Sequence, residues 1–424
     1  MTMTGWRRLT SSRPHRLLTT AAAGALLVSG CGVLPGASGG SRDPVTVMTW
    51  APDTAGADAV NMAGMPAMAR TYARWINEQG GIDGHELRVL TCNEQDTAAG
   101  ASTCARRAAD QDVAAVIGSY SRHGRAFLAP LEAAGIPYIG GYGASADEFT
   151  SYLSYPVNGG QPALVAGNGE QLAATCEQVS LVRPDSLVGD TMPGLLDTSL
   201  SRSHRPGVYD ISAPEEATSY DSQAAKALVQ AGDGCVTAVL GEGTGTFFDS
   251  FRRLEPQGSE VRISSVLGSV GQSLINRSGG PNSPFEGALV TGWYPDSEDA
   301  GWDEMRQVID TYAFGDNRID PEDPGVQTTW IAYTVLKAVV EAMDESSITA
   351  GGISVSLNRG TEVDTGGLTP VLRWRFQDMV GTAPYGRIVN ARVTFQVVRQ
   401  GRLTSAKKGF VDVTQTLVGA DPHS

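Results

Sequence analysis

The chain has 424 residues, with 32 lysines and arginines against 46 aspartates and glutamates, so its formal net charge at pH 7 is −14. A net acidic surface argues against a nucleic acid as partner and suits a soluble, exported protein. The length is sufficient for two ordinary domains. After the N-terminal segment no apolar run is long enough to cross a membrane.

The first 30 residues have the features of a secretory signal. Four arginines and no acid precede an apolar run of 12 residues, whereas a membrane span needs about 20. The run ends in Val28-Ser29-Gly30-Cys31, which resembles a bacterial lipobox, whose cysteine receives a lipid and becomes the new N-terminus. An ordinary cleaved signal with an incidental cysteine is the alternative. Residues 31–43 are predicted to form a flexible tether, and removal of 1–30 changes the formal charge to −18.

From residue 45 to residue 291, apolar strand patterns alternate with helical patterns. Strands are expected at 45–50, 86–91, 114–117, 136–139, within 180–188, and at 208–211, 236–240, 261–265 and 289–291. Helices are expected at 62–76, 102–111, 125–134, 162–176, 192–201, 221–230 and 246–254. This alternation predicts parallel sheets covered on both faces. Because the series restarts near residue 162, it predicts two α/β lobes.

The order of elements changes toward the C-terminus. Two helices are predicted at 299–313 and 326–343, and the second has an apolar face. The remainder has β character at 372–376, 391–398 and 410–413. The chain therefore ends in strands rather than in a further βα series.

Residues 75–87 join a helix end to the start of a strand. Gly80-Gly81 stops the helix and Asp83-Gly84 is a turn pair, which on pattern alone describes a corner of any α/β protein. The segment closely resembles the corner after the first helix of type I periplasmic-type binding proteins, the family of the leucine/isoleucine/valine receptors of ABC importers. The residues that match its "iN..GGI.G..I.L" stretch are Ile76, Asn77, Gly80, Gly81, Ile82, Gly84 and Leu87.

The resemblance covers nearly all of residues 44–415, since 286–291 and 330–333 also match family stretches. It implies two doubly wound Rossmann-like lobes joined by three crossings, near 155–158, 292–295 and 366–368. The implied divisions are 44–156 plus 293–366 for lobe 1, 157–292 plus 367–415 for lobe 2, and 416–424 as a tail. The C-terminal β segment is longer than expected and fits the family least well.

Four cysteines follow the signal, at positions 92, 104, 176 and 235. An even number in an exported chain predicts disulfides, with three possible connectivities. Cys92–Cys104 would close a short local loop, which leaves Cys176–Cys235 within the other lobe. A metal site is disfavoured because the chain has no C-x-x-C and no nearby histidine pair. Neither a metal nor a cofactor is expected.

Ligands of open parallel α/β sheets bind beyond the C-terminal ends of the strands, where helix N-termini favour anions. The residues that follow the predicted strands are therefore the candidate ligand-binding residues. In lobe 1 they are Trp50, Ser119, Tyr120, Ser121, Arg122, Tyr142, Ala144 and Ser145. In lobe 2 they are Asp190, Thr191, Glu242, Gly243, Thr244 and Ser269.

The family resemblance implies roles for some of these residues. Ser121 matches the first serine of a G-x-x-S-S loop that holds the amino-acid head group, but Arg122 replaces the second serine. Ala144-Ser145 matches an Ala-Thr pair, whose amides and hydroxyl would complete a carboxylate cradle. A helix cap is the alternative role for Ser119 or Ser121. Glu242 is a candidate partner for an ammonium group.

One departure from the family concerns the ligand. Amino-acid receptors of the family can carry an acidic residue after the strand at 261–265, to pair the ammonium group. This chain has Gly268-Ser269 there, which argues against an α-amino acid. Tyr142 either packs on the ligand or fills the lobe edge.

The resemblance implies a lipid-anchored, extracytoplasmic receptor that binds a small polar solute between its lobes and delivers it to an ABC permease. We expect a monomer. A sensor lipoprotein of the same fold is the alternative. A hydrolase is disfavoured because the chain has no H-E-x-x-H, no G-x-S-x-G and no metal-spaced histidine cluster. His123 lies near Ser121 in sequence, but proximity alone makes no catalytic pair, and no catalytic residue is assigned.

Overall fold

A computed structural model describes residues 42–54, 60–256, 258–381 and 383–420. The expected signal at 1–30, the expected lipidation site at Cys31 and most of the expected tether lie outside these residues. Residues 42 and 43 of the expected tether are held in place, because Arg42 pairs with Asp83 and the Asp43 N–H donates to the Ser346 carbonyl. None of the described helices is long and apolar enough to pass through a membrane.

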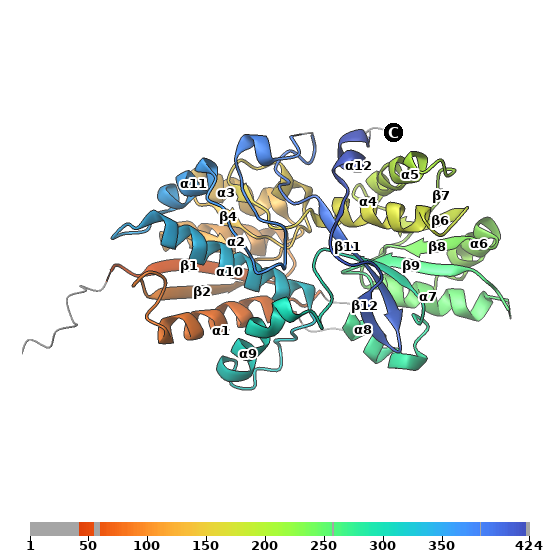
Figure 1. Ribbon diagram of the computed structural model, residues 1–424, viewed down its shortest axis with the longest axis horizontal. Helices are drawn as coiled ribbons and strands as arrows, with labels where there is room; N and C mark the ends of the chain where they lie inside the picture. The colour runs from red at the N-terminus through yellow and green to blue at the C-terminus, as the bar shows by residue number, and fades with distance from the viewer. Residues whose placement is uncertain (1–41, 55–59, 257, 382, 421–424) are drawn as a thin grey trace, which may run out of the picture. The chain divides into compact units, whose positions relative to one another are not determined.

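The first lobe is built on a parallel sheet of five strands in the order β2-β1-β3-β4-β5 (Figure 1). The strands are β1 (Val45–Ala51), β2 (Leu87–Asn93), β3 (Ala115–Ile117), β4 (Tyr138–Ile139) and β5 (Ser154–Tyr155). The helices between them are α1 (Gly64–Glu78), α2 (Ala98–Asp110) and α3 (Gly124–Ala134).

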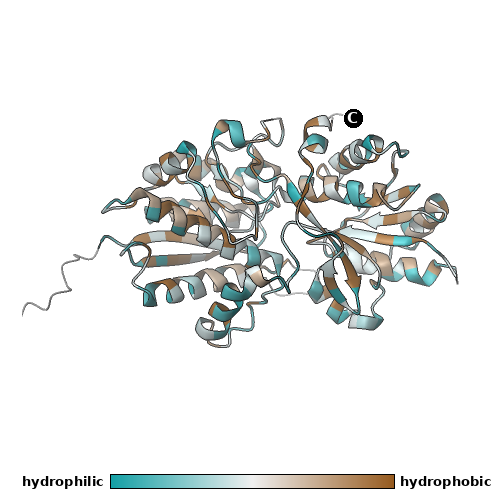
Figure 2. Ribbon diagram, in the orientation of Figure 1, coloured by the Kyte–Doolittle hydropathy of each residue, from teal (hydrophilic) through white to brown (hydrophobic). Residues whose placement is uncertain are grey.

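Alternation along β1 explains how both faces of this sheet are covered. Val45 and Val47 pack in a cluster with α1, while Met48 and Trp50 pack in another cluster with α2 and α3. Successive side chains of a strand point to opposite faces, so helices cover the sheet on both sides. Figure 2 shows hydrophobic residues along the strands of this sheet.

The corner between α1 and β2 has a direct structural explanation. Gly80 and Gly81 adopt φ values of 99° and 83°, which L side chains rarely adopt. A Cβ on Gly81 would lie only 2.1 Å from the His85 carbonyl oxygen. The Asn77 side chain donates to the Leu87 carbonyl and accepts from the Leu87 N–H. The matched residues of the corner therefore join the end of the helix to the start of the strand.

The second lobe is built on a mixed sheet in the order β12-β11-β10-β9-β8-β6-β7. Its parallel strands are β6 (Val179–Pro184), β7 (Tyr209–Ala213), β8 (Cys235–Ala238), β9 (Arg262–Val266) and β10 (Leu289–Gly292). β11 (Arg392–Arg399), β12 (Arg402–Ser405) and β13 (Val411–Asp412) pair antiparallel. Its helices are α4 (Gly160–Ala173), α5 (Met192–Arg202), α6 (Asp221–Ala231), α7 (Gly243–Leu254) and α8 (Gln272–Arg277).

Both expected disulfides are present, Cys92–Cys104 and Cys176–Cys235. The first joins β2 to α2 in the first lobe. The second joins the segment after α4 to the start of β8 in the second lobe. Two doubly wound α/β lobes, each with one disulfide, are therefore confirmed.

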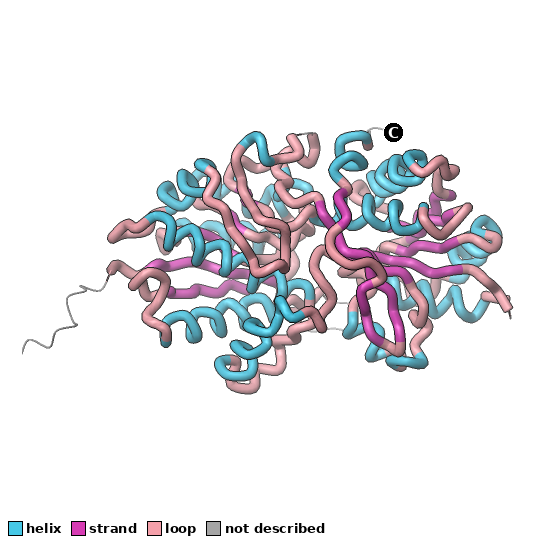
Figure 3. Tube along the Cα trace, in the orientation of Figure 1, coloured by secondary structure: helices cyan, strands magenta, loops and turns pink. Residues whose placement is uncertain are grey.

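The chain returns to the first lobe after β10. There α9 (Asp303–Tyr312) and α10 (Pro324–Met343) pack against α1, and α11 (Ala350–Arg359) packs against α10. The last of these helices was not expected. The chain then forms long loops, drawn pink in Figure 3, before it enters β11.

The expected strand at 372–376 is wrong. Leu372 makes a single bridge to Val363, and Phe376–Asp378 forms a 3-10 turn. The buried Trp374 donates its indole N–H to the Pro156 carbonyl, and Arg387 donates to the Ser154 carbonyl. These side chains cover the edge of β5 instead of extending a sheet. After these loops the chain enters the second sheet at β11.

The expected tail also contains structure. Residues 414–419 form α12 (Thr414–Gly419), which packs on α4 and α5. Leu417 is buried within that contact. An apolar side chain covered by two helices stabilises the end of the described chain.

Candidate functional site

The loop after β3 is tied to β1 by Ser119. Its hydroxyl accepts a hydrogen bond from the backbone N–H of Trp50 at 3.0 Å, and its carbonyl accepts one from the Tyr138 hydroxyl. Trp50 is fully buried, with its ring 5.6 Å from that of Phe127 and 6.0 Å from that of Tyr138. Trp50 therefore lies in the core of the first lobe, below α2 and α3.

Ser121 binds a carboxylate that belongs to the protein. Its hydroxyl donates to Oε2 of Glu94 at 3.0 Å and accepts from the His123 N–H at 3.1 Å. Both Ser121 and Glu94 are fully buried. Burial raises the pKa of Glu94, although the hydrogen bond from Ser121 opposes that shift. The alternative role of Ser121 as a helix cap is not observed, because its hydroxyl binds the N–H of His123, which precedes α3, and α3 has no side-chain cap.

Arg122 is likewise paired within the protein. Its Nε donates to Asp96 at 3.0 Å, and a second N–H binds the other carboxylate oxygen. These hydrogen bonds raise the pKa of Arg122. A guanidinium that already holds one carboxylate in this two-point manner has fewer donors to offer to another.

The loop after β4 closes around Glu148. Oε1 of Glu148 accepts from the Ser145 N–H at 3.1 Å, and Oε2 accepts from the Gly143 N–H at 3.2 Å. The Ser145 hydroxyl accepts from the Asp147 N–H, so this segment is a capping box at the start of a 3-10 turn, Ala146–Phe149. Burial raises the pKa of Glu148 to about 8, against the opposing effect of the backbone hydrogen bonds. Ala144 lies half-buried between the two bonded amides.

Tyr142 contacts groups from outside the first sheet. Its ring centroid lies 5.1 Å from that of Tyr120 and 5.1 Å from that of Trp293, which follows β10. A Cβ built on Gly268, after β9 of the second lobe, would lie 3.2 Å from the Tyr142 hydroxyl. The half-buried Tyr142 is therefore placed where loops of both lobes meet.

The lobe 2 loops are held by neutral hydroxyls. The Ser269 hydroxyl accepts from the Gly241 N–H at 3.1 Å, and the Thr244 hydroxyl accepts from the Leu240 N–H at 3.0 Å. Gly243 starts α7, and a Cβ there would lie 2.7 Å from the Tyr220 hydroxyl. Glu242 precedes this helix and its side chain is exposed. These hydrogen bonds bring the loops after β8 and β9 together.

Asp190 and Thr191 belong to a separate set of interactions. The Arg183 guanidinium donates to Asp190 at 2.7 Å and also binds Asp210 of β7. The Thr191 hydroxyl donates to the Val188 carbonyl at 2.8 Å. Both residues thus stabilise the segment between β6 and α5.

Comparison with known proteins agrees with this architecture, since a model of the family of periplasmic binding proteins matches residues 46–407. The chain belongs to the periplasmic binding protein family. Proteins of this family bind small molecules outside the cytoplasm and work with ABC permeases. A search of curated protein sequences found no match.

Several solved structures are similar to this periplasmic binding protein. A substrate-binding periplasmic protein from Ralstonia solanacearum is 16% identical, with a TM-score of 0.69 over 85% of this chain and 99% of that chain. A branched-chain amino acid ABC transporter protein from Thermus thermophilus, with bound valine, is 15% identical, with a TM-score of 0.69 over 89% and 99%. A fatty acid ABC transporter substrate-binding protein from Thermomonospora curvata is 13% identical, with a TM-score of 0.69 over 89% and 96%. At these identities the similarity concerns the fold.

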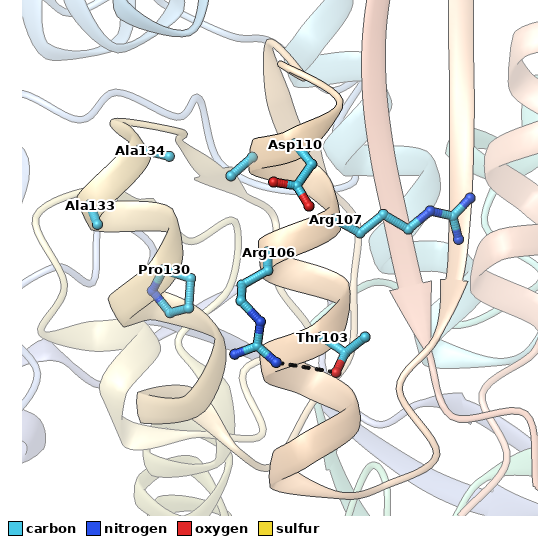
Figure 4. A pocket seen from close by; sticks show the side chains of 8 residues that line it. Thr103, Arg106, Arg107, Asp110, Pro130, Ala133 and Ala134 are labelled. Carbon is cyan, nitrogen blue, oxygen red and sulfur yellow. Dashed lines mark hydrogen bonds between the residues drawn. The ribbon is translucent and has the colours of Figure 1, made fainter.

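Two surface cavities of this binding protein lie elsewhere. One, of ≈ 530 Å³, lies between α2 and α3 and is lined by residues such as Arg106, Asp110 and Pro130 (Figure 4). Ala133 and Ala134 also line it, so this cavity extends to the C-terminal end of α3. That end of the helix precedes the start of β4, whereas the expected ligand site lies beyond the ends of the strands. The other, of ≈ 310 Å³, involves the loops around Glu298 and Glu322.

Sequence reasoning missed four residues of this region: Glu94, Glu148, Trp293 and Asp323. Glu94 directly follows β2, so the search for candidate residues after each strand could have included it. Asp323 precedes Pro324 and caps α10, as its carboxylate accepts from the Gly325 and Val326 N–H groups, which an Asp-Pro pair can signal. Burial raises the pKa of Asp323 to about 6. Glu148 was signalled only by the Ser145-x-x-Glu148 spacing of a capping box, which does not indicate burial.

Proposed function

We propose that this binding protein is a solute receptor of an ABC importer, which binds a small polar ligand between its lobes and is anchored through lipid on Cys31 as a monomer. The observation that carries the proposal is the position of Tyr142. It extends from the β4 loop of the first lobe, packs against Trp293 at the second crossing and approaches Gly268 of the second lobe. A ligand beside Tyr142 would contact both lobes at once.

The proposal has a mechanical consequence. A ligand that contacts both lobes only when they approach each other stabilises the closed arrangement in proportion to its differential affinity. Hinge closure of this type is an established response of two-lobed receptors. A permease that recognises the closed arrangement would then engage the loaded receptor in preference to the empty one.

The test uses the chain from Cys31 onward and a ligand panel of amino acids, amides, small carboxylates and amines. A bound ligand raises the melting temperature by about 3 °C at saturating concentration and lowers the radius of gyration in small-angle scattering. Tyr142→Ala removes both effects, while Tyr152→Ala, which alters an exposed tyrosine of the same lobe, keeps them. A panel without any shift contradicts the proposal.

A further inference from the structure

The donors that would hold a ligand carboxylate in the first lobe are already bound by the protein's own acids. Glu148 accepts from the amides of Gly143 and Ser145. Glu94 accepts from the Ser121 hydroxyl. Together these groups account for three donors of the two loops where the anion site was expected.

The Glu148 carboxyl group is fixed in that position. The side chain is 2% exposed, and the β4 loop passes so close that a Cβ on Gly141 would lie 2.0 Å from Oε2. The Ser145 hydroxyl is fixed as well, because a Cβ on Gly124 of α3 would lie 2.1 Å from it. Displacement of Glu148 by a ligand would leave a buried acid without its hydrogen bonds, which is costly.

Arg122, the cation that follows Ser121 in the β3 loop, is also engaged. Arg122 binds both carboxylate oxygens of Asp96. In the first lobe, acids of the chain therefore bind the Gly143 and Ser145 amides, the Ser121 hydroxyl and the Arg122 guanidinium. A solute that brings a carboxylate would have to compete with each of these contacts.

The groups that remain around Tyr142 suit a cation. The rings of Tyr120 and Trp293 flank Tyr142 at 5.1 Å each, and aromatic faces attract ammonium groups. Glu242 follows Gly241, whose N–H binds Ser269, the neighbour of the Gly268 that approaches the Tyr142 hydroxyl. Asp323 caps α10, and the Thr328 hydroxyl of that helix binds the hydroxyl of Tyr294, the neighbour of Trp293. Each lobe therefore contributes one acid to the loops around Tyr142.

We propose that the solute is an organic amine cation without a carboxylate, and that Glu148 is the residue that excludes carboxylate-bearing analogues from the first lobe. This inference rests on the proposed interlobe site. Its cationic group lies against Tyr142 and Trp293, and Asp323 and Glu242 supply the opposite charge.

The first experiment compares compounds that share a skeleton but differ in charge. The probes are 3-methylbutylamine, leucine and 3-methylbutanoate, together with choline and glycine betaine, each in a thermal-shift titration at pH 7.5. A shift of about 3 °C with the two cations, and none with their carboxylate-bearing counterparts, supports the inference. A shift with leucine or 3-methylbutanoate alone overturns it and leaves the receptor proposal intact. No shift with any compound, here or in the wider panel, contradicts both.

The second experiment tests the role of Glu148 directly. Glu148→Ala frees the amides of Gly143 and Ser145, so affinity for 3-methylbutanoate is expected to rise about tenfold or more, which corresponds to 1.4 kcal/mol. Glu304→Ala, at an exposed glutamate of α9, is the matched control and leaves affinity unchanged. An unchanged rejection of carboxylates by Glu148→Ala overturns the assignment.

A crystal structure of the unaltered chain with 3-methylbutylamine keeps the inference testable if Glu148→Ala does not fold. Ligand density against Tyr142 and Trp293 supports the inference. Density for the amine at any other place overturns it.

Discussion

The loops at the strand ends of the two lobes are held in different ways. In the first lobe, buried acids bind the loop donors, as Glu148 does for Gly143 and Ser145. In the second lobe, hydroxyls take that role, as Ser269 does for Gly241. A buried acid costs free energy when it ionises, whereas a buried hydroxyl has no such dependence on pH. The two lobes should therefore differ in their response to mutation and to pH.

Removal of the disulfides should cause the largest changes in stability, and each lobe contains one disulfide, so the two lobes can be compared. Cys176–Cys235 closes a separation of 59 residues and Cys92–Cys104 one of 12. Loop-closure entropy predicts a loss of about 4 kcal/mol for Cys176→Ala/Cys235→Ala and about 3 kcal/mol for Cys92→Ala/Cys104→Ala. Urea denaturation of the two double variants measures both losses. A larger loss from the lobe 1 pair would show that chain entropy does not set the order.

Glu148→Ala is expected to destabilise the first lobe by about 3 kcal/mol, since two enclosed amides lose their acceptor and the core loses a packed side chain. The free energy of unfolding in urea at pH 5 measures this loss. Glu304→Ala removes an exposed glutamate of α9 and should change the free energy by less than about 0.5 kcal/mol. Equal effects of the two variants would contradict a structural role for the buried carboxyl group.

The pH dependence of stability provides a third test. The folded pKa of Glu148 is raised from 4.5 to about 8, so the native state binds more protons than the unfolded state between these values. Stability should fall because of this group as the pH rises from about 4.5 to about 8. The stability of Glu148→Gln, whose side chain cannot ionise, should not show this decrease.

Asp323 supplies the control within the same protein. Its pKa is raised from 3.8 to about 6, so a shallower fall below about pH 6 should remain in Glu148→Gln. Melting temperatures at half-unit pH intervals distinguish the two windows. An identical profile for the variant and the unaltered chain would exclude Glu148 as the source.

Strand and helix periodicity predicted most of the alternating α/β series, because a buried parallel strand and an amphipathic helix have distinct patterns. Periodicity failed to predict an element where contacts between distant segments determine the secondary structure. The helix α11 begins directly after Thr349, whose hydroxyl accepts from the Gly352 N–H, and it contains Gly351 and Gly352 in its first turn. Such residues disfavour a helix, but burial of Ile353 and Leu357 compensates.

The ligand region was predicted less completely than the fold. Reading the ends of strands made Tyr142, Ser145 and Ser269 candidates, and the structure brings Tyr142 close to the loop of Ser269. The same reasoning treated these loops as open to a ligand anion. It had no means of detecting that Glu94 and Glu148 would be buried beneath them, because burial of an acid depends on contacts between distant segments.

The smallest effect should come from the neutral contact of the second lobe. Ser269→Ala removes the acceptor of the Gly241 N–H and should cost about 1 kcal/mol. Gly241 is exposed, so water can replace the lost hydroxyl, and the cost should not change between pH 5 and pH 8. Ser222→Ala, at an exposed position of α6, is the matched control. A loss for Ser269→Ala that varies with pH would show that charge also stabilises the lobe 2 loops, and the contrast between the lobes would then not hold.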